Sequence, residues 1–187
     1  MWKIYFLLWV SGAGKTTLFQ ELDKVSQDNF VYVPSYTTRD TRPGEIHGKK
    51  YRHISQEEFE QGIANGEFME RAESTNIGTY YGTKYEDMIA PTREGKNTIK
   101  EIEPVWLEKV IKEWKVTDNL VTIFLDIDDE TIVQRLNSRW SQWEIPNRVA
   151  RAQMERDMAK KYCDHFIDAS RPLEEVKADF FKLLEIE

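Results

Sequence analysis

The sequence predicts an α/β fold in which a parallel sheet is covered by helices on both faces and a small α+β lobe is inserted. Three observations indicate this. Continuous apolar runs alternate along the chain with segments whose apolar residues recur at helical spacing. A glycine-rich loop joins the first apolar run to the first of these helices. Between residues 35 and 93 the alternation gives way to short strands and small helices, which indicates an insertion.

In the first half of the chain, apolar spacing and capping residues indicate the elements. The run 4–10 is apolar throughout, which is typical of a strand buried on both faces. Ser55 and Glu58 form a capping box that opens a helix. Residues 80–83 are interpreted as a turn, with Thr83 as the cap of the following helix. We expect strands at 3–10, 30–33 and 67–72, and helices at 16–25, 55–65 and 83–89.

In the second half, the run 119–127 is the clearest buried strand, and Asp128 is expected to cap the helix after it. Pro91 is expected to end or kink the helix before it, and Pro104 to start the next one. We expect strands at 97–102, 119–127 and 166–167, and helices from 104 to about 111, 128–139, 147–161 and 173–184.

Composition limits the class of protein. The 187 residues suffice for one domain, or for one core with small inserted lobes. The net charge of −7 argues against general nucleic-acid or anionic-membrane binding. One cysteine allows no internal disulfide, and three scattered histidines lack metal-ligand spacing. The apolar run 4–10 is too short to span a membrane. We therefore expect a cytoplasmic protein without nucleic-acid or membrane partners.

The glycine-rich loop has the residue types that bind a polyphosphate. It matches the pattern G-x-x-x-x-G-K-[ST] everywhere except at the first position, where Trp9 stands. Glycines let backbone N–H groups approach phosphate oxygens, and the helix after the loop presents its positive end. The alternative is a Gly/Ser-rich loop that only closes a strand. The candidate phosphate-binding residues are Ser11, Gly12, Ala13, Gly14, Lys15, Thr16 and Thr17, with Thr16 as the candidate Mg²⁺ ligand.

A second anion site is indicated by Arg39 and Arg42, which stand three residues apart among hydroxyl side chains and ahead of a Pro-Gly turn. Two guanidinium groups at this spacing can bind one phosphate together. The alternative is a solvated loop with two surface arginines.

Four further stretches make the resemblance to a family specific: residues 35–45, 48–51, 66–70 and 81–83. In order and spacing they resemble the GMP-binding lobe of guanylate kinases, and the resemblance extends from residue 3 to the last helix. It implies a P-loop NTPase core at 1–34 and 94–187, with a lid at about 137–149. It also implies an inserted lobe at 35–93 that binds the nucleoside monophosphate.

The resemblance implies roles for individual residues. Lys15, Arg39, Arg135, Arg139 and Arg148 would be catalytic, the last three as arginines of the lid. Glu70 would accept hydrogen bonds from guanine N1–H and the 2-amino group. The substrate-binding residues would be Ser35, Arg39, Arg42, Tyr51, Glu70, Tyr81, Gly82, Thr83, Glu101 and Glu103. Glu101 and Glu103 stand where the family usually has Asp-x-Asp, and Ala169 and Ser170 where it often has Asn-Asp near the adenine.

The implied activity is the phosphorylation of GMP to GDP by ATP with Mg²⁺, through direct in-line transfer, with dGMP as a candidate second substrate. A carboxylate at Glu70 would face a lone pair on adenine, which disfavours AMP. The expected partners are the small molecules GMP and ATP, and the chain is expected to be a monomer or homodimer. Two alternatives stay open: a binding module without catalysis, which Trp9 favours, and a P-loop kinase for another phosphorylated acceptor.

Three tryptophans stand where the resemblance leads us to expect glycine: Trp9, Trp106 and Trp140. Glycine is also scarce, with nine residues against about thirteen at average usage. We hypothesise that UGA codons encoding glycine have been read as tryptophan. The alternative is that the tryptophans are genuine, in which case Trp9 is expected to weaken or abolish ATP binding. Intact mass or peptide sequencing of the native protein decides, because tryptophan at these positions ends the hypothesis.

Overall fold

A computed structural model gives the structure of residues 2–25, 29–74, 78–114, 119–137 and 143–186. The elements in chain order are β1 (Ile4–Trp9), α1 (Lys15–Val25), β2 (Phe30–Tyr32), β3 (Ser35–Thr37), β4 (Tyr51–His53), α2 (Gln56–Ala64), β5 (Phe68–Ser74), β6 (Thr79–Lys84), α3 (Tyr85–Arg93), β7 (Asn97–Glu101), α4 (Pro104–Trp114), β8 (Leu120–Asp126), α5 (Asp129–Leu136), α6 (Ile145–Tyr162), β9 (His165–Asp168) and α7 (Leu173–Leu183).

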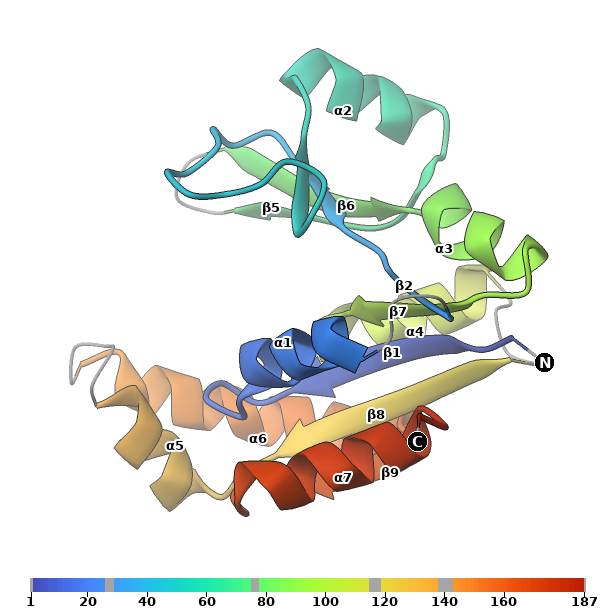
Figure 1. Cartoon of the computed structure of the whole chain (residues 1–187). Helices are drawn as coiled ribbons and strands as arrows, with labels where there is room; N and C mark the ends of the chain where they lie inside the picture. Colours follow the sequence, from blue (N-terminus) through green and yellow to red (C-terminus); the bar gives the residue numbers. More distant parts are fainter. Residues whose placement is uncertain (1, 26–28, 75–77, 115–118, 138–142, 187) are drawn as a thin grey trace. The chain divides into compact units, whose positions relative to one another are not determined.

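The strands form two sheets (Figure 1). The five-stranded sheet has the order β2-β7-β1-β8-β9, and its β2–β7 and β8–β9 pairs are parallel. The four-stranded sheet has the order β4-β3-β6-β5, in which β6 runs antiparallel to both of its neighbours. The predicted α/β class with a parallel sheet flanked by helices is thereby confirmed.

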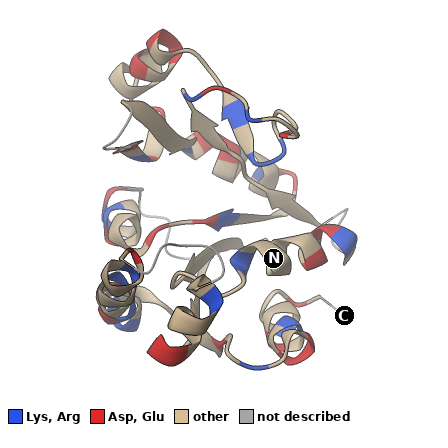
Figure 2. Cartoon of the chain, turned by 90° about the vertical axis from the view of Figure 1, so that its left-hand side faces the viewer, with Lys and Arg blue, Asp and Glu red and all other residues tan. Residues whose placement is uncertain are grey.

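The chain divides into two compact units. Unit 1 contains Met1–Ile4, Phe30–Lys100 and Lys109–Leu120, and unit 2 contains Tyr5–Asn29, Glu101–Glu108 and Val121–Glu187. Basic and acidic residues are interspersed along the chain in both units (Figure 2). The four-stranded sheet lies in unit 1, within the segment 35–93 that was interpreted as an inserted lobe. The exact boundaries of the core and the lobe stay a prediction.

Unit 2 is built around two fully buried apolar runs. Residues 5–8 of β1 and residues 123–125 of β8 have no exposed surface. Helices α1 and α7 lie on one side of these strands and α6 on the other (Figures 1 and 2). Covering both faces explains why the strands read as continuous apolar runs rather than as alternating patterns.

In unit 1, helix α2 packs against one face of the four-stranded sheet. Phe59 of α2 stacks on Phe68 and Tyr80, with ring centroids 4.3 and 5.3 Å apart. Gly62 and Gly82 permit this close approach, because a Cβ on either residue would lie within 2.8 Å of the Phe68 ring. One face of the sheet is therefore apolar and covered, and side chains on the opposite face are available for other contacts.

Three local predictions in this unit are wrong. Residues 80–83 form the middle of strand β6 instead of a turn, because this segment pairs with β3 on one side and β5 on the other. Thr83 does not cap α3: the N-cap is Lys84, which makes no capping side-chain bond. The helix also continues beyond the expected end at Ile89, through Pro91 to Arg93.

Candidate active site

The glycine-rich loop after β1 has the backbone that a phosphate cradle requires. Gly12 and Gly14 adopt φ angles of +88° and +82°, in the left-handed region that favours glycine. A Cβ on Gly14 would meet no atom within 4 Å and would project into open space. Helix α1 begins at Lys15, directly after the loop, and its Thr17 and Leu18 N–H groups donate to the Gly14 carbonyl oxygen at 2.9 and 3.2 Å. The loop and this helix end together can bind an anion.

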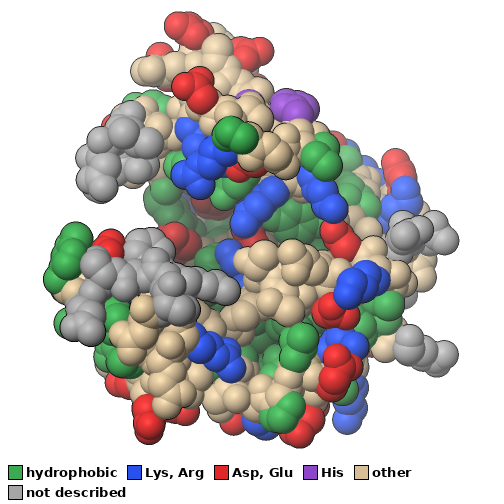
Figure 3. Space-filling model, turned by 60° about the vertical axis from the view of Figure 1, so that its left-hand side comes forward, with side chains coloured by type: hydrophobic (Ala, Val, Ile, Leu, Met, Phe, Trp, Pro, Cys, Tyr) green, Lys and Arg blue, Asp and Glu red, His purple; other side chains and the backbone are tan. Residues whose placement is uncertain are grey.

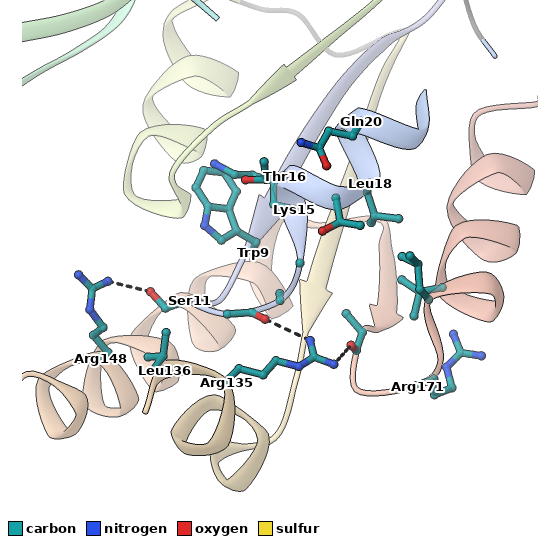
Figure 4. Close-up of a pocket in the computed structure, with 17 residues that line it drawn as sticks. Trp9, Ser11, Lys15, Thr16, Leu18, Gln20, Arg135, Leu136, Arg148 and Arg171 are labelled. Atoms are coloured by element: carbon teal, nitrogen blue, oxygen red, sulfur yellow. Dashed lines mark hydrogen bonds between the residues drawn. The ribbon is translucent and has the colours of Figure 1, made fainter. Parts of the chain in front are cut away.

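A pocket of about 840 Å³ opens over this loop (Figure 4). All seven predicted phosphate-binding residues, 11–17, line it, together with Trp9, Arg135 and Arg148. Sequence reasoning did not select the remaining lining residues, which are Leu18, Gln20, Leu136, Ala169, Arg171, Leu173 and Val176. Two of them belong to α1 and one to α5, and the other four lie in the segment from Ala169 to Val176, around the start of α7. Only the departure at Ala169 and Ser170 pointed toward that segment.

Lys15 lies between an aromatic ring and a carboxylate. Its Nζ is 3.4 Å from the centroid of the Trp9 ring and 3.2 Å from Glu101 Oε2. Figure 4 shows the indole beside the lysine at the mouth of the loop. Trp9 ends β1 and is not among the described residues with positive φ, so its backbone does not need glycine. The effect of Trp9 is therefore on the space and charge around Lys15.

Replacing Trp9 by glycine should tighten ATP binding by about five- to ten-fold. The Trp9→Gly change removes a cation–π contact worth about 1 kcal/mol and opens the approach of phosphate to Lys15. Isothermal titration of ATP into both proteins measures the effect. Trp106→Gly is the matched control, because Trp106 does not line this pocket. Equal ATP affinities for Trp9→Gly and the unchanged chain would contradict this prediction.

Two of the three arginines assigned to the lid hold the phosphate loop. Arg135 of α5 donates to the carbonyl oxygens of Gly12, at 3.1 Å, and Ala169, at 3.0 Å. Arg148 of α6 donates to Ser11 Oγ at 3.1 Å. Both arginines thus place positive charge against the cradle (Figure 4). Arg139 and Trp140 lie outside the described residues, as does the rest of the stretch 138–142 in the predicted lid.

Glu101 and Glu103 lie in unit 2, and each forms an ion pair with a basic residue of that unit. Glu101 contacts Lys15, and Glu103 Oε2 is 3.0 Å from Arg151 Nη2. The resemblance assigns both glutamates to GMP binding, and that role stays a prediction. The contact of Glu101 means that a polyphosphate must compete with a carboxylate for the Lys15 ammonium.

The face of the four-stranded sheet opposite α2, called the uncovered face below because α2 does not pack on it, carries most of the predicted GMP-binding residues. The ladders pair Glu70 of β5 with Thr83 of β6, and Ser35 of β3 with Tyr51 of β4. Thr37 pairs with Tyr81 of β6, so continuing that antiparallel register places Ser35 opposite Thr83. Cross-strand partners point to the same face. Ser35, Tyr51, Glu70, Tyr81 and Thr83 therefore share one face, opposite the face that α2 covers.

Contacts between these side chains agree with the register. Thr83 Oγ1 donates to Glu70 Oε1 at 2.6 Å, and the rings of Tyr51 and Tyr81 lie 6.0 Å apart. Thr83 is fully buried. Gly82, between Tyr81 and Thr83, faces Phe68 on the covered side, where it lets the sheet and helix pack closely. Its assignment to substrate binding stays a prediction. Figure 3 shows basic side chains and a histidine on the exposed surface of this unit.

Arg39 is held beside this face by Glu45. Its guanidinium forms a two-pronged ion pair with the Glu45 carboxylate and lies 4.9 Å from the centroid of the Tyr51 ring. The Arg42 backbone N–H also donates to Glu45, at 2.9 Å, so Glu45 connects the two arginines of the predicted second anion site. The Arg39 guanidinium, helped by the Arg42 N–H, lowers the pKa of the Glu45 carboxyl from 4.5 to about 2. Sequence reasoning gave Glu45 no role; its place three residues after Arg42 was the available signal.

Replacing Glu45 by glutamine should raise the KM for GMP by about ten-fold and leave the KM for ATP unchanged. The neutral amide loses the charge that orients Arg39, so the guanidinium is held less firmly for the GMP phosphate. Steady-state kinetics at varied GMP test this. Glu60→Gln, on the exposed surface of α2, is the control. An increase in the KM for ATP of the same size would show that Glu45 acts on the whole fold.

The same variant gives a stability test with a defined sign. Because the pKa of Glu45 is lowered on folding, its stabilising contribution is complete above about pH 4.5 and is lost as pH falls through about 2. Unfolding curves of the unchanged chain and Glu45→Gln should therefore differ at neutral pH and converge toward pH 2.

Neither a metal cluster nor a membrane span is found in the part of the chain that the structure describes. No three His, Cys, Asp or Glu side chains there could share a metal ion. None of the described helices has the length and apolar character needed to cross a bilayer. Thr16, exposed in the first turn of α1, offers a hydroxyl oxygen beside the cradle. Such a site suits Mg²⁺, which usually takes few protein ligands and completes its shell with phosphate and water oxygens.

Comparisons with known proteins indicate the family of this chain. The family model described as guanylate kinase matches residues 1–185. Guanylate kinase of Onion yellows phytoplasma (strain OY-M) is 39% identical over 155 residues, which is 81% of this chain and 71% of that protein. Guanylate kinase of Streptococcus thermophilus (strain CNRZ 1066) is 36% identical over 166 residues, which is 87% of this chain and 77% of that protein.

Solved structures show the same fold. The crystal structure of guanylate kinase from Anaplasma phagocytophilum matches with a TM-score of 0.69 and 25% identity, covering 98% of this chain and 85% of that one. A sugar kinase from Janibacter sp. HTCC2649 matches with a TM-score of 0.52 at 15% identity, which is a likeness of fold alone. The family match over nearly the whole chain and the curated relatives at up to 39% identity lead to one conclusion. This chain belongs to the guanylate kinase family.

Proposed function

We propose that this chain transfers the γ-phosphoryl group of ATP to GMP and forms ADP and GDP. It is a nucleoside monophosphate kinase by family. One observation supports GMP as the acceptor. Glu70 and Thr83 lie side by side on the uncovered sheet face, with a hydrogen bond of 2.6 Å between them. A phosphate cradle alone would suit many donors, whereas a carboxylate at this position selects the acceptor base.

The donor side is the cradle of unit 2. Loop N–H groups and the start of α1 would bind the triphosphate, and Lys15 would exchange its contact with Glu101 for phosphate oxygens. Mg²⁺, held by the Thr16 hydroxyl and by phosphate oxygens, would neutralise charge on the β- and γ-phosphates. Arg135 and Arg148 would stabilise the charge that develops on the transferred group. We extend this role to Arg139 on the resemblance alone.

The acceptor side is the uncovered face of unit 1. Arg39, Arg42, Tyr51 and Tyr81 would hold the GMP phosphate, of which Arg39 is already oriented by Glu45. An oxygen of that phosphate attacks the γ-phosphorus, the bond between the γ-phosphorus and the bridging oxygen breaks, and the electron pair leaves with ADP. No covalent enzyme intermediate is needed, because positioning and charge stabilisation supply the catalysis.

Base selection rests on hydrogen-bond pairing. Glu70 would accept from guanine N1–H and the 2-amino group, with the Thr83 hydroxyl donating to its other side. Adenine presents a lone pair at N1 and no amino group at C2, so the carboxylate would face no donor. Sites of this kind discriminate by on the order of 10⁴. dGMP keeps the same base edge and is proposed as a second substrate.

A coupled assay of ADP formation by the purified chain tests the function. We expect ADP to form when ATP, Mg²⁺ and GMP are all present, and GDP to appear in equal amount. AMP and UMP should compete weakly with GMP, and dGMP should compete well. ADP formation that does not depend on GMP, or a preference for AMP or UMP, would contradict the proposal.

The position of Trp9 against Lys15 supports one alternative, a binding module that holds a phosphorylated ligand without catalysis. This alternative predicts GMP binding in titration but no GDP from the chain as written. It also predicts that Trp9→Gly restores turnover. We place the protein in the cytoplasm, as a monomer or homodimer; size-exclusion chromatography with light scattering measures the second point.

A further inference from the structure

Lys100 is a buried lysine that the proposed reaction does not use. It lies on β7, and 2% of its surface is exposed. Its Nζ donates to the carbonyl oxygen of Val33 at 3.1 Å and to Ser35 Oγ at 2.6 Å. Lysine is almost never fully buried unless it is paired, and a buried parallel strand normally has an apolar residue at such a position. The burial of an ammonium group here calls for a reason.

The contact with Lys100 fixes the chemistry of the Ser35 hydroxyl. A serine hydroxyl can accept or donate, and its hydrogen rotates to suit its partners. Because Lys100 donates to Ser35 Oγ, the oxygen acts as the acceptor in that bond. The hydrogen of the hydroxyl is then directed to a different partner. Ser35 is thereby prepared as a donor toward a ligand on the uncovered sheet face.

Ser35 continues the row that contains the base-selecting carboxylate. Glu70 pairs with Thr83, and the β3–β6 register places Ser35 next to Thr83 on the same face. The row therefore runs from a carboxylate acceptor at Glu70, through Thr83, to a hydroxyl donor at Ser35. The Watson–Crick edge of guanine has the complementary order: the 2-amino donor, the N1–H donor and the O6 acceptor.

We propose that Lys100 is a positioning residue for base selection, which orients the Ser35 hydroxyl as a hydrogen-bond donor to guanine O6. This inference rests on the proposed function and adds a second contact that distinguishes guanine from adenine. Adenine carries an amino group where guanine carries O6. An AMP base in this row would therefore meet mismatched partners at both ends, at Glu70 and at Ser35.

Changing one atom of the substrate tests the inference. 6-Thio-GMP keeps N1–H and the 2-amino group but replaces O6 by sulfur, a weaker acceptor. IMP keeps O6 and lacks the 2-amino group. For the unchanged chain we expect kcat/KM for GMP to exceed that for 6-thio-GMP by about ten-fold, the value of one hydrogen bond. In Lys100→Met the ratio should fall to about one, while the ratio of GMP to IMP stays as in the unchanged chain.

Two further variants separate positioning from folding. Ser35→Ala should lower the GMP to 6-thio-GMP ratio as Lys100→Met does, and combining the two changes should have no additional effect on that ratio. Lys96→Met removes an exposed lysine near the start of the same strand and should leave all ratios unchanged. If Lys100→Met does not fold, Lys100→Gln keeps N–H donors for Val33 without the charge, and its ratio should still fall at least three-fold.

The outcomes for this inference and for the proposed function are distinct. If the unchanged chain makes no GDP from GMP, the proposed function fails. If it makes GDP but the ratio of GMP to 6-thio-GMP is the same in the unchanged chain and in the Lys100 variants, the inference fails. Equal loss of activity toward GMP, 6-thio-GMP and IMP would also overturn it, because that pattern shows a purely structural role.

Discussion

Replacing Lys15 by methionine should lower kcat/KM for ATP by about 10²–10³-fold, the size expected when one group that stabilises the transition state is removed. Methionine keeps an unbranched, apolar stem against the Trp9 ring but removes the ammonium group. The Glu101 carboxylate, which is 3.2 Å from Lys15 Nζ, then remains beside the cradle without this cation and repels the triphosphate. Both effects act on the donor side, so the dissociation constant of GMP should not change.

Steady-state kinetics at varied ATP, together with GMP titration, measure both expectations. Lys24→Met is the matched control: Lys24 stands in the last turn of the same helix, is exposed, and pairs with Glu21. Its removal should change neither parameter. Thermal unfolding of both variants excludes loss of fold as the cause. A Lys15→Met protein with nearly unchanged kcat/KM for ATP would show that the cradle works without its lysine, and the assignment of Lys15 would be wrong.

The cradle could be predicted from the sequence because its geometry is local. A strand, a loop with two glycines and a helix follow one another within about twenty residues, and the positive φ angles of Gly12 and Gly14 are what such a loop requires. The capping box at Ser55 is present for the same reason, since its partners are three residues apart. Interactions of short sequence separation leave a readable pattern.

The contacts of the candidate acceptor site could not be predicted from the sequence, because they depend on pairing between distant segments. Strand β3 has three residues and no apolar alternation, and it exists through its ladders to β4 and β6. The same pairing explains why residues 80–83 form a strand where the sequence predicts a turn. It also places Thr83 on the same sheet face as Glu70. The resemblance to the family supplied the residues, but not the contacts that hold them.

Ion pairs between residues far apart in the chain could not be predicted from the sequence either. Glu101 stands 86 residues after Lys15, and only the fold shows that the two form an ion pair. Lys100 is next to Glu101 in the sequence, yet the fold directs its Nζ to the Val33 carbonyl oxygen and to Ser35 Oγ. An isolated charge in a sequence shows that a partner is needed, and the partner is chosen by tertiary structure.

Replacing Glu70 by glutamine should lower kcat/KM for GMP by about 10³-fold and should narrow the preference for GMP over AMP to a similar degree. The carboxylate offers two acceptor oxygens to guanine N1–H and the 2-amino group, whereas a glutamine amide must point its NH₂ group at one of these donors or at the Thr83 hydroxyl. A site that leaves a buried donor unpaired loses most of its discrimination. AMP does not depend on these bonds, so its low rate should change little.

Competition between GMP and AMP in one assay measures the change in preference directly. Glu73→Gln is the matched control, because Glu73 lies on the same strand, is exposed, and pairs with Tyr80 on the face that α2 covers. It should leave the preference intact. If Glu70→Gln lowers the rates with GMP and AMP equally, Glu70 supports the sheet rather than the choice of base. In that case the row from Glu70 to Ser35 would not be the guanine site.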